Sequence, residues 1–249
     1  MLFLLRNIRR KLLSSNQLVT YLLYAIGEIF LVVVGILIAV SIDDWNEERI
    51  KRQKEIHILK DLQAEFLKNK ESLQKTIIRN QISLEALEVV LQLMDQPESV
   101  LNKYNVDSLI FLTLEYDDFN PSQSVINEII SSGKMNLITS DTLRMLIFDW
   151  VAAMDEEEES YTTLDQVSQS MMLPYLAKNG TMKNLDFYGL LPKYGKSKFI
   201  SSNQALFQQL EFENNMDNQA WGITNYLNRL NSLDQLIEAL IYYTGPASQ

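Results

Sequence analysis

The sequence predicts an all-α protein in which an N-terminal transmembrane helix continues into a long helix that packs in an antiparallel helical bundle. Residues 21–42 form an apolar run, and the chain has only 8 glycines and 5 prolines in 249 residues. Apolar residues downstream recur with helical spacing, and few chain breakers over this length favour long helices. We divide the chain into a basic amphipathic segment (1–20), a transmembrane helix (21–42) and a helical soluble domain (43–249).

The transmembrane helix is predicted from the run YLLYAIGEIFLVVVGILIAVSI, in which Glu28 is the only charged residue. As a helix this run spans about 33 Å, which matches the hydrocarbon core of a bilayer. A signal peptide would have a shorter apolar region that ends in small residues, whereas this run ends at two aspartates. Tyr21 and Tyr24 at one end and Trp45 at the other are typical interfacial aromatics.

The segment ahead of the run is basic and amphipathic. It suits a helix in the headgroup layer, and it also serves as a flank that sets topology. Because it has no acidic residue, we expect a cytoplasmic N-terminus and an external domain, which is periplasmic in a Gram-negative cell. The basic residues are Arg6, Arg9, Arg10 and Lys11.

One stripe of the transmembrane helix predicts a helix–helix interface. Glu28, Val32, Gly35 and Ala39 share this stripe, and Gly35 with Ala39 forms the small-xxx-small pattern that permits close approach. Glu28 has two interpretations, a proton-relay carboxylate or a hydrogen-bonding group within an assembly. We favour assembly because the rest of the run offers no polar path for a proton.

The next predicted helix runs from residue 43 to about 94, before Pro97. A heptad with a at Ile56 and d at Leu59 is mostly apolar, but polar residues interrupt it and further apolar residues widen its stripe. This pattern favours a bundle helix over a free two-stranded coiled coil. The interruptions are Gln63, Lys70 and Asn80, and the widening residues are Leu62, Leu67, Ile78 and Ile82.

Shorter elements follow a polar connector at residues 96–107. The apolar run 109–114 fits a strand or a helix equally well. Asn120 and Pro121 are a typical helix start, and Gly133 is a typical stop.

The C-terminal half is predicted to hold long helices. One opens at Ser140 or Asp141 and runs to about Ala177, with a kink or an early end at Pro174. Residues 179–198 form the main loop. Helices resume at 202–212 and 217–243.

Composition excludes several kinds of chemistry. The net charge of −10 argues against nucleic-acid binding, which needs a basic patch. The absence of cysteine excludes disulfides and thiolate sites, and His57 is the single histidine. We therefore expect no metal site, no cofactor and no enzymatic activity.

Two polar clusters have a possible chemical interpretation and a simpler one. Asp155 to Glu159 suggests a cation site, but five consecutive helical residues fan around more than a full turn, so we expect a solvated face. Ser131, Ser132 and Gly133 suggest a nucleophile loop. Without a neighbouring base they fit a helix C-cap better.

The stretch YLLYAIGEIFLVVVGILIAVSIDDWNEER, from Tyr21 to Arg49, closely resembles the anchor of an uncharacterised Bacteroidota family of single-pass membrane proteins, domain of unknown function 6090. Residues 131–144 resemble a second recurring element of that family. The resemblance implies coverage of most of the chain and a Gram-negative inner membrane. It implies no activity, substrate or catalytic residue.

Three functional hypotheses remain. The first is a membrane-anchored, non-enzymatic interaction or scaffold protein, either a homo-oligomer or an accessory subunit of an envelope complex. The second is a ligand-sensing helical domain that signals through a partner, and the third is a proton-coupled subunit using Glu28. A ligand-sized polar pocket would favour the sensor, and a closed bundle with an exposed apolar patch would favour the scaffold.

Overall fold

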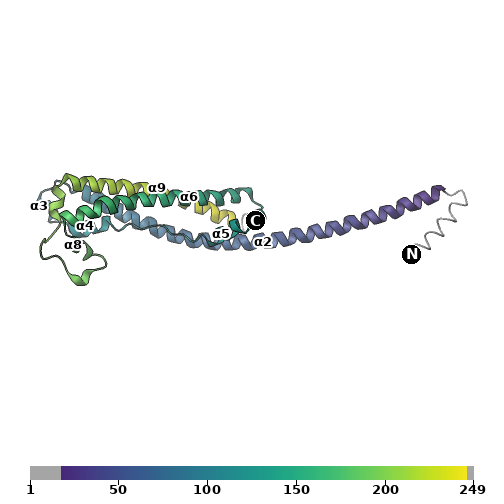
Figure 1. The fold of residues 1–249 in the computed structure, drawn as a ribbon, viewed down its shortest axis with the longest axis horizontal. Coiled ribbons are helices and arrows are strands. Elements are labelled where there is room, and N and C mark those ends of the chain that lie inside the picture. Colours follow the sequence, from purple (N-terminus) through teal and green to yellow (C-terminus); the bar gives the residue numbers. More distant parts are fainter. Residues whose placement is uncertain (1–17, 246–249) are drawn as a thin grey trace. The chain divides into compact units, whose positions relative to one another are not determined.

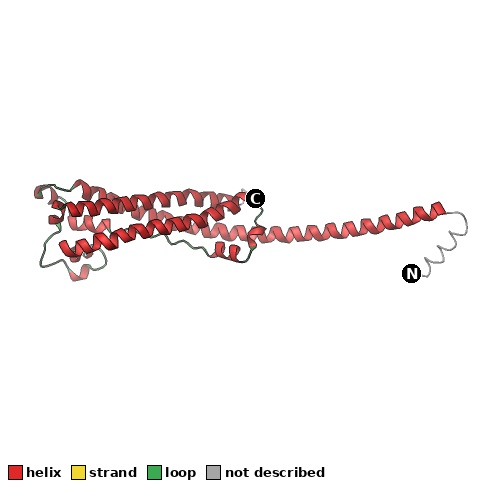
Figure 2. Ribbon diagram, turned by 45° about the horizontal axis from the view of Figure 1, so that its top comes forward, coloured by secondary structure: helices red, strands yellow, loops and turns green. Residues whose placement is uncertain are grey.

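The computed structural model describes residues 18–245, which form helices, turns and loops and no β-strand (Figure 2). The predicted all-α class is therefore confirmed. The basic residues Arg6, Arg9, Arg10 and Lys11 of the predicted amphipathic segment lie outside the described residues.

The chain has two compact units, Met1–Ile56 and His57–Gln249, and one helix belongs to both. This helix, α2, runs without interruption from Leu18 to Gln92 and contains 75 residues. The predicted continuation of the apolar helix into the bundle helix is thus confirmed.

In the N-terminal unit, α2 carries the apolar run. Among residues 18–245, one helix is long and apolar enough to cross a membrane, and its most apolar 18-residue window has no buried side chain. Most apolar side chains between Leu22 and Ile42 are therefore exposed.

The C-terminal unit is built on three long helices, namely α2, α6 (Asp141–Val167) and α9 (Leu210–Thr244) (Figure 1). The α9 helix is antiparallel to α2, because Lys70 pairs with Glu238 and Gln74 bonds Asp234. It is also antiparallel to α6, because Arg229 pairs with Glu156 and Gly222 lies against Leu164.

Short helices close the ends of this unit. The α3 (Glu98–Leu101), α4 (Val106–Thr113) and α8 (Met182–Asp186) helices gather at one end, and α5 (Ser124–Ser131) lies at the other (Figure 1). The ambiguous run 109–114 is thus helical in α4.

The buried face of α2 differs from the predicted a/d seam. The d residues within α2 are buried together with the whole row of g residues from Glu55 to Val90, whereas the a residues are only half-buried or exposed. Leu67, Ile78 and Ile82 were expected to widen the buried stripe, and this expectation is wrong, because at heptad positions e, b and f they point away from the core.

Buried polar residues of α2 bind an extended segment. Residues 114–123, here called the strap, connect α4 to α5 and run antiparallel along α2. Buried Asn80 donates from Nδ2 to the backbone oxygen of Asp117 at 2.8 Å. Asn69 donates to the Ser122 carbonyl at 2.7 Å and accepts its N–H at 2.9 Å.

The strap also explains why α5 begins at Ser124 and not at the predicted Asn120. Glu65 of α2 accepts the N–H of Val125 at 3.2 Å and the hydroxyl of Ser122 at 2.7 Å, so a distant carboxylate caps this helix. The predicted stop is confirmed, since Gly133 follows α5 with a φ of 69°.

The α6 helix begins as predicted, because the Ser140 hydroxyl accepts the N–H of Leu143 at 3.2 Å. The predicted disturbance at Pro174 is also present. A π-helical turn, η2 (Ser168–Met172), separates α6 from α7 (Leu173–Asn179), and Pro174 lies in the first turn of α7. Proline has no N–H for the regular helical ladder, so the helix changes its pitch just upstream.

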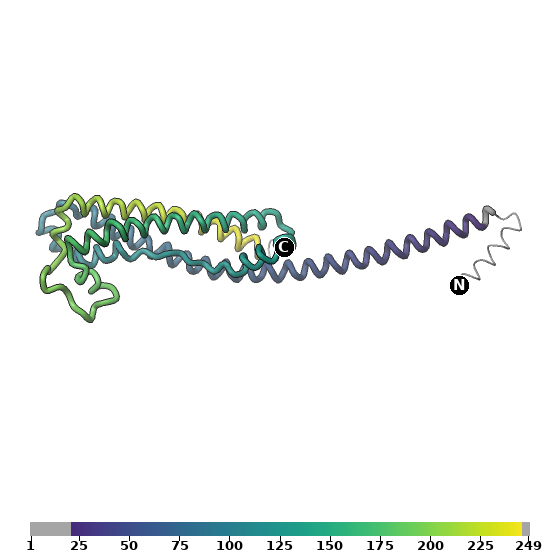
Figure 3. The backbone as a smooth tube through the Cα atoms, in the orientation of Figure 1, coloured from purple at the N-terminus to yellow at the C-terminus, as the bar shows by residue number. Residues whose placement is uncertain are grey.

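The predicted loop 179–198 holds two short helical pieces, α8 and the 3-10 turn η3 (Pro192–Tyr194). The helix predicted at 202–212 is replaced by the 3-10 turn η4 (Gln204–Gln208), and α9 begins at Leu210, earlier than expected. The tube in Figure 3 follows this loop at the end of the bundle.

Candidate functional site

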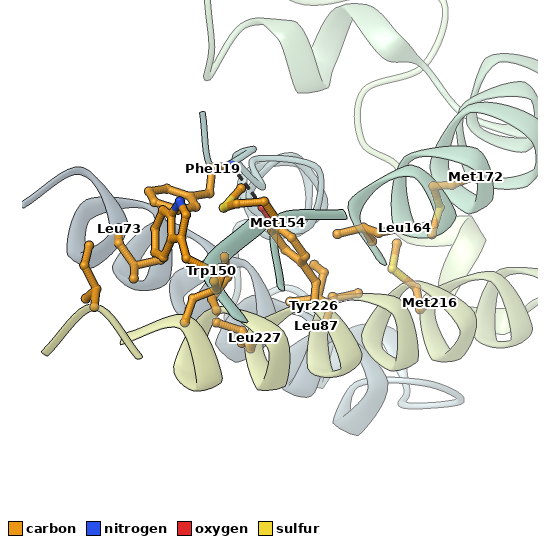
Figure 4. Close-up of a cluster of buried hydrophobic side chains, with 14 of the residues drawn as sticks. Leu73, Leu87, Phe119, Trp150, Met154, Leu164, Met172, Met216, Tyr226 and Leu227 are labelled. Carbon is orange, nitrogen blue, oxygen red and sulfur yellow. Dashed lines mark hydrogen bonds between the residues drawn. The ribbon is translucent and has the colours of Figure 1, made fainter. Parts of the chain in front are cut away.

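The centre of the bundle is organised around an aromatic side chain of the strap. Phe119 is buried, and its ring lies edge-on to the Trp150 ring at 6.5 Å. Phe66 packs on the same indole at 5.4 Å. Figure 4 shows Phe119, Trp150 and Met154 gathered beside Tyr226 of α9.

A hydrogen-bonded chain passes from the strap to α9 and α6. The Phe119 N–H donates to the Tyr226 hydroxyl at 2.9 Å (Figure 4). The hydroxyl of Tyr226 donates in turn to Oε1 of Glu157, which is only 2% exposed. Three elements thus meet at one carboxyl group.

Burial changes the acidity of Glu157 and Tyr226. Desolvation, helped by the charges of Asp118 and Glu158 and opposed by the Tyr226 hydrogen bond, raises the pKa of Glu157 to about 7. Burial and the adjacent carboxyl raise the pKa of Tyr226 far above its ordinary value. Near neutral pH, Glu157 therefore exchanges between its neutral and charged forms.

Glu157 also lines a cavity of about 320 Å³ between the strap and α6. Four carboxylates face this cavity, and none of its described lining residues is basic, so its electrostatic potential favours cations. Within the described residues, no group of three or more His, Asp or Glu side chains could hold a metal ion. The lining residues are Asp118, Phe119, Asn120, Pro121, Gln123, Val151, Met154, Asp155, Glu157, Glu158, Tyr161 and Thr162.

This site corrects the expectation of a solvated acidic face. The other four residues of the run 155–159 are exposed, but Glu157 is buried. The signal was its register, because Trp150, Met154, Glu157 and Leu164 lie three, four or seven residues apart and face the same core.

A second surface feature is an apolar groove between α2 and α4, with a volume of about 580 Å³. Its floor is made of Ile78 and Ile82 of α2 with Phe111 and Leu112 of α4. Its rim carries both charge signs, Lys75 and Arg79 on α2 with Glu115 and Asp117 on the strap.

The predicted transmembrane interface lies on the uncovered part of α2. Glu28, Val32, Gly35 and Ala39 are exposed, and a methyl group built on Gly35 would meet no atom within 4 Å. This face is therefore open to a second helix.

The predicted anchor aromatics differ in exposure. Tyr24 and Trp45 are exposed and Tyr21 is half-buried. The guanidinium of Arg49 lies 5.7 Å from the centre of the Trp45 ring, an arrangement that suits a charged side chain beside an interfacial aromatic.

A comparison with known protein families shows the family of this chain. The profile described as "Family of unknown function (DUF6090)" matches residues 28–155, just over half of the chain. The chain belongs to this family. The DUF6090 match begins at Glu28 within the apolar run and ends at Asp155 in α6, so it is shorter than the expected coverage of most of the chain. Searches of curated proteins and of solved structures found no match.

Proposed function

We propose that this DUF6090 chain is a membrane-anchored, non-enzymatic interaction protein that self-associates as part of an envelope complex. The observation that carries the proposal is the apolar groove between α2 and α4. Ile78 is 58% exposed and Ile82 is 47% exposed, although both belong to a helix that buries its opposite face. Such an uncovered apolar patch is typical of a binding surface.

The rim of the groove favours a second copy of the chain as the occupant. Arg79 pairs with Glu115 at 3.3 Å and with Asp117 at 3.1 Å, so the charges of the rim are balanced within the chain and a second copy would meet no net repulsion there. Two anchors in one membrane would run parallel, which suits a two-fold axis along the membrane normal.

We propose that the anchor adds to the same assembly through Gly35 and Ala39, because small residues let helices approach closely in lipid. Glu28, on the same stripe, then hydrogen-bonds across the interface. We further propose an inner-membrane location, with the N-terminus in the cytoplasm and the bundle in the periplasm. The basic N-terminal segment supports this orientation.

The experiment is chemical crosslinking of the full chain in native membranes. Ile78→Lys with Ile82→Lys should lower the crosslinked dimer several-fold, because each lysine would have to be desolvated in the interface. Gly35→Leu with Ala39→Leu should lower it independently. The matched control is Met145→Lys with Phe148→Lys, which changes two equally exposed apolar residues of α6 outside the groove.

An unchanged dimer in both test variants would overturn self-association. A heterologous crosslink lost only in the groove variant would assign the groove to another protein and would also overturn it.

The acidic cavity favours a second candidate function, the sensing of a small organic cation. Its volume lies at the lower end of ligand-sized pockets, and its carboxylates surround the aromatic Tyr161. Spermidine should raise the thermal midpoint of the wild-type chain but not that of Asp118→Asn with Asp155→Asn. Glu159→Gln is the control, because Glu159 is exposed and does not line the cavity. Equal shifts in all three proteins would remove this candidate.

A further inference from the structure

The loop between α8 and η4, residues 187–203, presents two apolar side chains directly to solvent. Phe199 is 98% exposed and Leu190 is 96% exposed, the highest values among the large apolar side chains that the structure describes. Tyr194 is exposed beside them. Figure 3 shows this loop projecting from the end of the bundle.

The same loop is basic in an acidic protein. Lys193, Lys196 and Lys198 are its only charged residues, whereas the whole chain has a net charge of −10. Lys193 and Lys198 are exposed, and the Lys193 ammonium lies 5.0 Å from the centre of the Tyr194 ring. Lysine and tyrosine next to exposed apolar side chains are typical of the bilayer interface.

The loop is exposed although hydrogen bonds hold its base to the bundle. Its base is a buried polar network in which Asp107 of α4 accepts the backbone N–H and the side-chain amide of Asn203, both at 2.9 Å. Asn184 of α8 accepts the N–H of Ser197 at 2.8 Å. Lys196 lies 3.4 Å from the Asp107 carboxylate, so one of the three lysines holds the loop in place.

The loop is held at this base, and the side chains of Leu190 and Phe199 stay exposed to solvent. A protein partner would need a separate pocket for each protruding side chain, whereas the interfacial layer of a bilayer accepts such side chains without a matched shape. Anionic headgroups would attract the lysines, and the acidic remainder of the chain would be repelled, so only this loop would lead the approach.

We propose that the 187–203 loop docks on an anionic bilayer surface, with Leu190 and Phe199 entering the interfacial layer and Lys193 and Lys198 contacting lipid phosphates. This inference goes beyond the proposed self-association and does not depend on it. It gives the chain a second membrane contact, separate from the apolar part of α2.

The test uses the full chain held by its anchor in nanodiscs of phosphatidylcholine. These nanodiscs are mixed with separate vesicles of phosphatidylcholine, with or without phosphatidylglycerol, and bound protein is measured by flotation. We expect binding only to the vesicles that contain phosphatidylglycerol. Leu190→Ser with Phe199→Ser should weaken it by more than about tenfold, because two apolar side chains lose their burial.

Charge is tested with Lys193→Gln and Lys198→Gln together, which should weaken binding by about tenfold or more and reduce its salt dependence. The matched control, Met145→Ser with Phe148→Ser, changes apolar residues of similar type elsewhere on the bundle and should bind like the wild type.

Insertion is read directly with a fluorophore, because the natural chain has no cysteine. Phe199→Cys carrying an environment-sensitive dye should brighten and shift to the blue with anionic vesicles. Trp221→Cys, at an exposed position of α9, should not change. Equal binding to both kinds of vesicle, or wild-type binding by the Leu190/Phe199 double variant, would overturn the proposal, whatever the crosslinking assay shows.

Discussion

Glu157 accepts the Tyr226 hydroxyl, and Tyr226 accepts the Phe119 amide, so α6, α9 and the strap share one hydrogen-bonded chain. A carboxyl in this position costs less when it is neutral, because the charged form loses its hydration. The neutral carboxyl still accepts the tyrosine proton. The protonation state of Glu157 is therefore linked to the packing of the bundle centre.

At this residue the structure predicts a pH-dependent stability. The pKa of Glu157 is about 7 in the folded chain, against an ordinary value of 4.5, so the folded state holds the proton more tightly than the unfolded state. This contribution is complete below the unfolded pKa and is lost as the pH rises through the folded pKa. Glu157→Gln keeps an acceptor for Tyr226 and removes the ionisation.

The measurement is the thermal midpoint of the full chain in detergent at about pH 5 and about pH 8. The wild type should lose more stability than Glu157→Gln between these values. Glu159→Gln, which changes an exposed neighbour that does not line the cavity, should behave like the wild type. An identical pH dependence in wild type and Glu157→Gln would show that this carboxyl does not titrate in the folded chain.

The sequence contained part of this site. The spacing from Trp150 through Met154 to Leu164 places Glu157 on the buried face of its helix. Its four acidic neighbours suggested a solvated surface instead. The prediction followed this acidic composition and not the helical spacing of Glu157 from the apolar residues. The roles of Tyr226 and Phe119 were not predictable, because Tyr226 lies 69 residues from Glu157 and 107 residues from Phe119 along the chain.

At the scale of elements, local signals predicted helices well where the chain supplies its own cap. Ser140 caps α6 and Gly133 follows α5 as expected. Asn120 failed as a helix start because the cap of α5 is Glu65, which lies in another helix. Periodicity reports which residues of a helix are apolar, but it does not report which distant backbone a polar residue will bind.

The path of the strap could not be predicted from the sequence. Asn80 interrupts the predicted seam of α2, and Asn69 lies on the neighbouring row of buried residues. In the structure their amides replace the backbone partners that an extended segment lacks inside a helical bundle. Asn80, one of the three residues that made the heptad irregular, therefore helps Asn69 to fix the path of residues 114–123.

At the scale of the whole molecule, the proposals assign different surfaces to different tasks. We propose that the apolar part of α2 serves as an anchor, that the groove between α2 and α4 binds a second copy, and that the 187–203 loop binds lipid. The side of the membrane on which the bundle lies decides which lipid surface this loop can reach. The remaining prediction therefore concerns the orientation of the chain in the membrane.

We predict that the bundle faces the periplasm, because the segment ahead of the apolar run is basic and has no acidic residue. The cysteine-free chain allows single-cysteine variants to report this directly. Ser170→Cys is the reporter for the bundle, because Ser170 is exposed whereas the nearby Ser168 is buried. Ser14→Cys reports the other side. In intact spheroplasts a membrane-impermeant maleimide should label the Ser170→Cys variant, and it should label the Ser14→Cys variant only after permeabilisation. Labelling of Ser14→Cys without permeabilisation, together with protection of Ser170→Cys, would reverse the orientation and place the bundle in the cytoplasm.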